Sequence, residues 1–260
     1  MIGTGLLAGV IAGLLGVGGG MVIVPALEYL LRFVEVPPAW RMHVAVATSL
    51  ATIVPTSIAS SRAHHRRGAI DLDLVRSWAG GMLAGGFAGS LFASRAPSGL
   101  LSGIFGCVAA AAALRMALPS QGRLLAPAPP RGVRGGALAT LIGALSALLG
   151  IGGGTFSVPV MALTGQPIHR AVGTAAVFGL LISLPGTVGY LLAEPPVHLP
   201  WGTVGWVSLT GVALIAPATV VTAPLGARLA HGLSRRTLSI VFAGFLLIVA
   251  ARMLHRTFAP

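Results

Sequence analysis

Apolar runs long enough to cross a lipid bilayer recur along the whole chain, and short polar connections separate them. An α-helix rises about 1.5 Å per residue, so about 20 apolar residues span the roughly 30 Å hydrocarbon core of a membrane. The pattern therefore predicts an all-α integral membrane protein that crosses the bilayer several times. Eight apolar helical segments are expected, at residues 2–33, 42–61, 72–94, 98–117, 133–165, 170–192, 201–227 and 237–254.

A stretch rich in proline and glycine divides the chain near its middle. Residues 119–132, PSQGRLLAPAPPRG, cannot continue a helix, because proline lacks a backbone N–H and clashes with the preceding turn. We expect a linker here, between a first membrane repeat at residues 1–118 and a second at 133–260. The first residues lack the basic region of a cleavable signal, so they are expected to belong to the first segment.

The two halves of the chain repeat one another. GLLGVGGGMVIVP at residues 13–25 returns as ALLGIGGGTFSVP at 147–159, an offset of 134 residues. ATSLATIVPTS at 47–57 aligns with GTAAVFGLLIS at 173–183, an offset of 126 residues. Offsets that differ so little predict two homologous units of four segments each.

Arginines lie in opposite connections of the two halves. In the first half the connection after the second segment is rich in arginine and the next one is poor, and in the second half this order is reversed. Positive residues favour the cytoplasmic side of a membrane, so the reversal predicts two halves of inverted topology. The arginines concerned are Arg62, Arg66 and Arg67, then Arg95, in the first half, and Arg228, Arg235 and Arg236 in the second.

Inversion requires an odd number of crossings in each half, so one segment of each four should enter the membrane without crossing it. Segments 1 and 5 are the candidates, because each is interrupted at its GxGGG motif and is expected to form a discontinuous or re-entrant helix. The alternative is eight plain crossings with tilt. Arg252 and Arg256 would lie outside in the inverted arrangement, which counts against it.

Composition agrees with a membrane protein and limits its chemistry. Hydrophobic residues make up 55% of the chain and charged residues 8%, too few to coat a soluble globule of 260 residues. The net charge of +12 comes from arginines at the ends of apolar segments, which indicates topology rather than nucleic-acid binding. Cys107 is the single cysteine, so neither an intramolecular disulfide nor a cysteine-based metal site is expected.

Consecutive glycines inside a membrane helix predict a break that lines a cavity. Unpaired backbone groups are tolerated in a membrane only where protein or water surrounds them. A helix that restarts after the break directs free N–H groups and its positive dipole end at the break, which suits a small anion. The expected substrate-binding residues are the two clusters and the hydroxyls of the aligned helices: Gly16, Gly18, Gly19, Gly20, Met21, Thr48, Ser49, Ser57, Gly150, Gly152, Gly153, Gly154, Thr155, Thr174 and Ser183.

Simpler interpretations compete with this one. Gly81, Gly85 and Gly89 follow the small-xxx-small spacing of close helix packing, and packing is the interpretation we adopt for them. A buried hydroxyl such as that of Thr48 or Ser57 can also donate to the carbonyl four residues earlier in its own helix. The seven histidines all fall at segment ends, which favours residence at the membrane interface over a proton relay.

The sequence shows no nucleotide-binding motif and few acidic residues, so no catalytic residue, metal site or cofactor is expected. GVGGG is neither GxGxxG after a strand nor a P-loop, because no GK[ST] follows it. The five acids lie at or near segment ends, so no buried carboxylate pair is evident. They are Glu28, Glu35, Asp71, Asp73 and Glu194.

The duplicated motif resembles the TauE/SafE family of sulfite-exporter-like membrane proteins. The resemblance rests on the two glycine motifs, each followed by an ATS or GTA helix, with HHRRGAIDL at residues 64–72 and GARLAHGLSRRTL at 226–238. It implies a multi-pass transporter of the cytoplasmic membrane for small sulfur-containing anions such as sulfite, sulfoacetate or other sulfonates. Family members often keep a serine after the motif threonine, whereas Ala175 follows Thr174 here.

The sequence thus predicts a two-repeat transporter that moves a small sulfur-containing anion by alternating access. A passive anion channel and a non-transporting membrane scaffold are the alternatives. The expected partners are the anionic substrate and the lipid bilayer, without nucleic acid. The pattern leaves open the transported anion, the direction, the coupling ion and whether the chain forms a homo-oligomer.

Overall fold

A computed structural model describes residues 6, 10, 19–34, 36–117, 126–232 and 235–258. The first half contains α2 (Gly20–Leu30), the 3-10 turns η1 (Leu31–Phe33) and η2 (Pro38–Trp40), α3 (Arg41–Arg66), α4 (Leu72–Ala93) and α5 (Ser98–Ala117). The second contains α6 (Gly132–Leu149), α7 (Gly154–Leu163), α8 (Ile168–Leu192), β1 (Thr203–Val204), β2 (Val207–Ser208), α9 (Leu209–Gly232) and α10 (Arg235–Phe258).

Four helical stretches among the described residues are long and apolar enough to span a membrane. They are Pro38–Arg66, Ser98–Met116, Gly132–Leu149 and Ile168–Leu192. The expectation of a helical, multi-pass membrane protein is therefore confirmed at this level. The predicted segments at 42–61, 72–94, 98–117 and 170–192 correspond to α3, α4, α5 and α8. Of the predicted segment at 2–33, most of residues 2–18 lie outside the described residues.

The predicted segment at 201–227 was wrong at its start. Residues 203–208 form a short antiparallel hairpin in which Thr203 pairs with Ser208, and α9 begins only at Leu209. The chain turns at Gly205, whose φ is +55°. A short apolar run does not by itself distinguish strand from helix, and this hairpin is the exception to the all-α prediction among the described residues.

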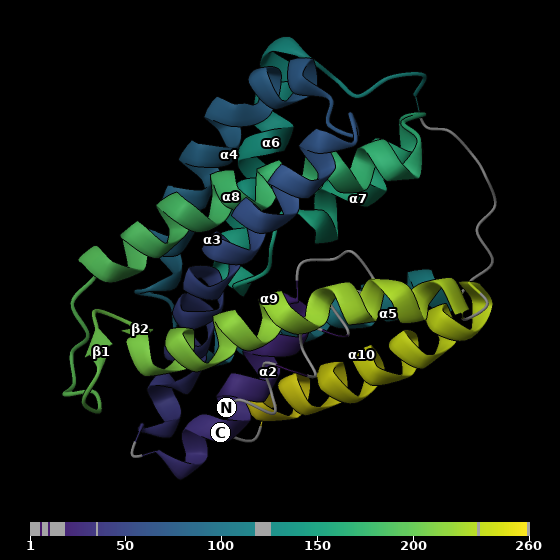
Figure 1. The fold of residues 1–260 in the computed structure, drawn as a ribbon. Coiled ribbons are helices and arrows are strands. Elements are labelled where there is room, and N and C mark those ends of the chain that lie inside the picture. Colours follow the sequence, from purple (N-terminus) through teal and green to yellow (C-terminus); the bar gives the residue numbers. More distant parts are fainter. Residues whose placement is uncertain are drawn as a thin grey trace.

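Helix α3 lies at the centre of the fold (Figure 1). Met42–Leu50 are all buried, so this part of the helix is covered on every side. Helix α8 packs along α3 in the opposite direction, because Gly173 contacts Ala69 beyond the end of α3 whereas Gly186 contacts Leu50 near its start. The two aligned helices of the repeats are therefore antiparallel neighbours.

Helices α5 and α10 form a second antiparallel pair (Figure 1). Gly106 packs against Leu254, and the Thr257 hydroxyl donates to the carbonyl of Gly99 across 3.3 Å. The end of α10 thus lies beside the start of α5. The last helices of the two repeats therefore pack against each other and run in opposite directions.

Glycines allow α4 and α6 to pack backbone to backbone. A Cβ at Gly85 would overlap the carbonyl oxygen of Thr140, and a Cβ at Gly89 would lie 2.7 Å from the Cα of Ala144. The packing role predicted for Gly81, Gly85 and Gly89 is confirmed, because all three face α6 at van der Waals distance.

Asp71 joins α4 to the turn between α7 and α8. Its Oδ1 accepts from the backbone N–H of Leu74 at 3.0 Å and so caps α4, and its Oδ2 accepts from Nε2 of Gln166 at 2.6 Å. Burial alone would raise the pKa of the Asp71 carboxyl. The two hydrogen bonds and the positive charges of Arg131 and Arg170 more than offset burial, so the pKa is lowered.

We expect Gly85→Ala to destabilise the protein by about 1–3 kcal/mol, because the added methyl group overpacks the α4–α6 contact. Gly80→Ala on the same helix is the matched control, since a Cβ there meets nothing within 4 Å. Thermal unfolding of both variants in detergent makes the comparison. Equal unfolding temperatures would contradict the close approach of the two backbones.

Asp71 is expected to make the folded state sensitive to acid. A carboxyl with a lowered pKa contributes stability above its unfolded-state pKa of about 3.9, and this contribution is lost as the pH falls through the lower folded-state value. Unfolding midpoints measured from neutral to acidic pH should show this loss in the wild type and not in Asp71→Asn. Asp73 is the exposed neighbour, and Asp73→Asn should lose stability on acidification as the wild type does. If Asp71→Asn also showed the wild-type pH dependence, Asp71 would not be the group responsible.

Candidate functional site

The second glycine cluster interrupts the helical backbone between α6 and α7. Helix α6 ends at Leu149, Gly150 takes a left-handed conformation with φ of +67°, and α7 begins at Gly154. A residue with a side chain would be strained at that φ. Within the described residues, the N–H groups of Gly152, Gly153 and Gly154 have no backbone acceptor, so the start of α7 presents free donors.

The first glycine cluster, in its described residues, also combines a left-handed glycine with a helix start. Helix α2 begins at Gly20, and Gly19 before it is left-handed with φ of +66°. The carbonyl of Gly19 accepts from the N–H groups of both Val22 and Ile23 at 2.9 Å. Gly16 and Gly18 lie outside the described residues, so their role stays a prediction.

The two clusters touch each other in the interior of the protein. A Cβ at Gly20 would lie 2.6 Å from the carbonyl oxygen of Gly150 and 2.7 Å from the Cα of Ile151. Ser49 of α3 donates its hydroxyl hydrogen bond to that same Gly150 carbonyl at 2.7 Å. The start of α2 is thereby brought against the break between α6 and α7, and a side chain of the central helix satisfies the carbonyl that the break exposes.

Helix α8 presents a polar face to the break before α7. Gly153 packs against Gly179, and Gly179 in turn lies against the Ser57 hydroxyl of α3. Ser183 follows Gly179 by one turn and so shares its face. The hydroxyls of Ser183 and Thr155 are buried and have no hydrogen-bond partner among the described residues. Both hydroxyls can donate to a polar ligand, as can the other hydroxyls that are buried without a partner in the described residues, those of Ser61, Ser146, Thr187 and Tyr190.

Thr48 and Thr174 have a different task from the one predicted. Thr48 of α3 accepts from the N–H of Ser208 at 3.0 Å, just before α9 begins. Thr174 of α8 accepts from the N–H of Asp71 at 2.9 Å, just before α4 begins. Each threonine therefore holds the start of the third helix of the opposite repeat, so these two hydroxyl oxygens are directed to helix starts rather than to the glycine breaks.

The competing interpretation of the hydroxyls applies to neighbours of the predicted residues. Thr52 and Thr56 donate to the carbonyls four residues earlier in α3, at 2.8 Å and 3.2 Å. Ser49 instead bonds across to Gly150. Met21, at the first turn of α2, is buried beside them.

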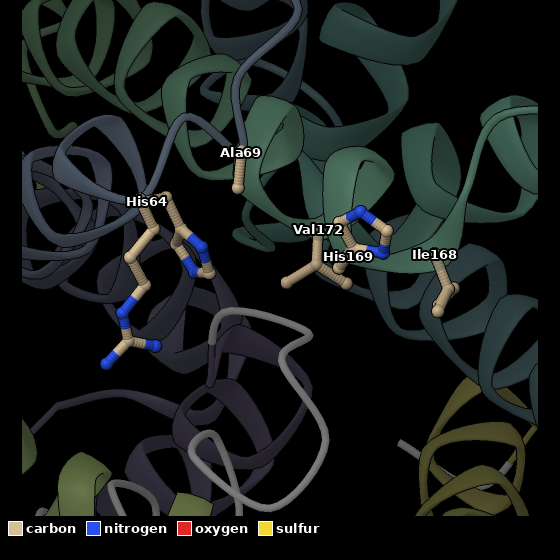
Figure 2. Close-up of a pocket in the computed structure, with 6 residues that line it drawn as sticks. His64, Ala69, Ile168, His169 and Val172 are labelled. Atoms are coloured by element: carbon tan, nitrogen blue, oxygen red, sulfur yellow. The ribbon is translucent and has the colours of Figure 1, made fainter.

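A pocket of about 360 Å³ lies at the end of α3, away from the breaks (Figure 2). Figure 2 shows His64 and Ala69 on one side of it and His169 and Val172 of α8 on the other. Arg67 and Ile168 complete its lining. The sequence analysis did not assign a site here, although the run HHRRG marked a basic end of the helix.

Two buried groups were also missed. Glu28 is fully buried and forms ion pairs with Arg32 at 3.9 Å, with Arg252 at 3.3 Å and with Arg256. The spacing of Glu28 and Arg32 by four residues was a usable signal for one of these pairs. His43, expected at the end of a segment, is buried within the protein: its Nε2 lies 2.9 Å from the carbonyl of Ala96, and its ring stacks on Trp206.

Comparison with known proteins agrees with a membrane transporter. A probable membrane transporter protein of Haemophilus influenzae is 37% identical over 255 residues, covering 96% of this chain and 95% of the relative. Probable membrane transporter proteins of Methanocaldococcus jannaschii and Bacillus subtilis are 26% and 27% identical, each covering 98% of this chain and 94% or 96% of the relative. No solved structure matches this chain.

The family expected from the duplicated glycine motif is confirmed. The family described as sulfite exporter TauE/SafE matches residues 1–253, which include both motifs and all but the last residues of α10. The chain therefore belongs to the sulfite exporter TauE/SafE family.

Proposed function

We propose that this protein transports a small sulfur-containing anion across the cytoplasmic membrane by alternating access, and that the anion binds where α2 and α7 begin. The observation that carries the proposal is the contact, inside the protein, between the start of α2 at Gly20 and the break that precedes α7, at Gly150–Ile151. Sulfite and organic sulfonates are the substrates to test first, because the family is named for sulfite export.

The chemistry at this place suits an anion. Each helix start carries about half a positive charge together with free N–H donors. The nearby polar side chains are the hydroxyls of Ser49, Ser57, Thr155 and Ser183, and the hydroxyls of Ser183 and Thr155 are free to donate. A site of backbone dipoles and neutral hydroxyls binds a small anion without a buried arginine, whose charge would be costly to leave unpaired when the anion departs.

An inverted repeat supports alternating access. The equivalent helices α3 and α8 are antiparallel neighbours, as are α5 and α10, which is the arrangement that a twofold axis in the membrane plane produces. The hydrogen bonds of Thr48 and Thr174 are also exchanged between the halves as such an axis requires. Two repeats around one site can exchange conformations, opening the site first to one side and then to the other.

The charge distribution suggests an orientation in the membrane. Exposed arginines gather at the end of the fold where α3 ends and α6 and α8 begin, whereas the loop after α8 carries none. Positive residues favour the cytoplasmic side, so we place this end in the cytoplasm. The exposed arginines at this end are Arg62, Arg66, Arg67, Arg131, Arg134 and Arg170.

Removing the two free hydroxyls should weaken substrate binding. We expect Thr155→Val together with Ser183→Ala to raise the KM for sulfite at least about tenfold in proteoliposomes, because each hydroxyl would donate a hydrogen bond to a charged ligand. Thr140→Ala is the control, since that hydroxyl is exposed and donates to its own helix. These substitutions test the site more directly than a large residue at Gly153 would. Even the Cβ of such a residue would lie 2.8 Å from the backbone nitrogen of Gly179, so that variant would also disturb the packing of α7 on α8.

Uptake must also saturate with sulfite and depend on an ion gradient, since linear flux without a gradient indicates a passive channel instead. Wild-type KM in the double variant would contradict the proposed binding site.

The orientation can be tested by labelling single cysteines. In a Cys107→Ser background, Glu194→Cys should react with a membrane-impermeant maleimide in intact cells, because it lies after α8 on the arginine-poor side. Arg66→Cys, at the end of α3, should react only after the membrane is disrupted. Both positions are exposed on the protein surface, so a difference in labelling reports the side of the membrane on which each one lies. The reverse pattern would invert the orientation.

A further inference from the structure

Four arginines surround the buried carboxylate of Glu28 at the end of α2. Arg32 follows it in η1, Arg41 begins α3, and Arg252 and Arg256 lie in the last turns of α10. We call these five residues the Glu28 cluster. Three of the arginines pair with Glu28 directly, while Arg41 donates from Nε to the carbonyl of Val36 at 2.9 Å.

The cluster is compact enough for its positive charges to repel one another. Arg256 donates from Nη2 to the carbonyl of Pro38 at 3.3 Å, and Arg41 binds Val36 two residues before it in the same loop. Arg41 accordingly experiences the charges of Arg32 and Arg256, and Arg252 those of Arg32 and Arg256. These arginines therefore act as one electrostatic unit.

The positive charge of this unit is not balanced. Within the described part of the chain, Glu28 is the acid that pairs with three of these four arginines, and Arg41 has no acidic partner. Glu35, in the same loop, lies outside the described residues. Among the described residues, four guanidinium groups therefore share one carboxylate. Partly buried positive charges in such excess are costly in a membrane protein unless an anion from outside compensates them.

The guanidinium groups remain accessible from outside the protein. The side chains of Arg32 and Arg252 are 40% and 34% exposed, whereas Glu28 behind them is 0% exposed. The guanidinium of Arg252 lies 4.5 Å above the ring of Tyr29, which fixes its plane. Each guanidinium has five N–H donors, so pairing with Glu28 leaves donors free on the outer side.

We infer that Arg32, Arg41 and Arg252 form the open side of an oxyanion-binding site in which Glu28 is the inner, permanent counterion. The ligand is a group with several equivalent anionic oxygens, such as sulfate, a sulfonate or a phosphate, because guanidinium groups bind such groups through paired hydrogen bonds. A free oxyanion and the phosphate of an anionic lipid share this chemistry. The exposed ring of Phe33 beside Arg32 is typical of the membrane interface, where both are available.

This site is separate from the glycine breaks. Glu28 follows Gly20 by eight residues, which is about 12 Å along α2. Oxyanion binding at the cluster and transport through the breaks can therefore be lost independently.

The test measures stabilisation of the purified protein by two probes. Sulfate is titrated in lipid-free detergent while thermal unfolding is followed, and nanodiscs of phosphatidylglycerol are compared with nanodiscs of phosphatidylcholine. Arg41→Gln is the main variant, because Arg41 does not pair with Glu28 and its loss relieves repulsion. We expect it to unfold no earlier than the wild type without anion, and to bind the oxyanion about tenfold more weakly.

Two further variants sharpen the result. Glu28→Gln removes the inner counterion, so it should bind the oxyanion more tightly than the wild type and depend on it more strongly for stability. Arg76→Gln, whose exposed partner is Asp73 at 3.6 Å, is the control and should respond as the wild type does. The double variant Thr155→Val, Ser183→Ala should also keep the wild-type response, which distinguishes this site from the transport site.

Each outcome bears on the assignment. Stabilisation by sulfate that Arg41→Gln weakens supports a soluble ligand, and stabilisation by phosphatidylglycerol alone, weakened in the same way, supports a lipid headgroup. An identical response of the wild type, Arg41→Gln and Glu28→Gln to both probes would overturn the site and leave the cluster a structural ion pair.

Discussion

The need to satisfy backbone hydrogen bonds inside a membrane governs this structure. A helix that stops between Leu149 and Gly154 exposes N–H and C=O groups that lipid cannot bind, so protein must enclose the break. The central helix α3 meets this need through the Ser49 hydroxyl on the Gly150 carbonyl, and α8 does so by packing Gly179 against Gly153. The donors that remain free at the start of α7 are the groups to which we assign anion binding in the proposed function.

Close contact between helices of the two repeats provides the enclosure. Helices α3 and α8 cross the centre side by side, and α4 and α6 meet backbone to backbone because Gly85 and Gly89 carry no side chain. The hydrogen bonds from the backbone N–H groups of Ser208 to Thr48 and of Asp71 to Thr174 attach the third helix of each repeat to the other repeat. Each repeat is thus attached to the other by a hydrogen bond, as expected if a movement of one repeat changes a site that both repeats form.

Charge is arranged in two different ways at the two ends of the fold. Exposed arginines without buried partners gather where α3 ends, which suits contact with the cytoplasm. At the other end, Arg252 and Arg256 pair with the buried Glu28. These two arginines count against an inverted arrangement when judged from sequence, and the single carboxylate of Glu28 does not neutralise both of them.

The sequence by itself determined the membrane class, the family and the location of the helix starts, because hydropathy and consecutive glycines act locally on the chain. It did not determine the partners of the hydroxyls: Ser49 donates to the carbonyl at the second break, whereas Thr48 and Thr174 accept from the N–H groups just before α9 and α4. Nor did it reveal the hairpin before α9 or the pairing of Glu28 with arginines more than 200 positions away. These contacts depend on how distant helices pack, and only the tertiary structure decides that.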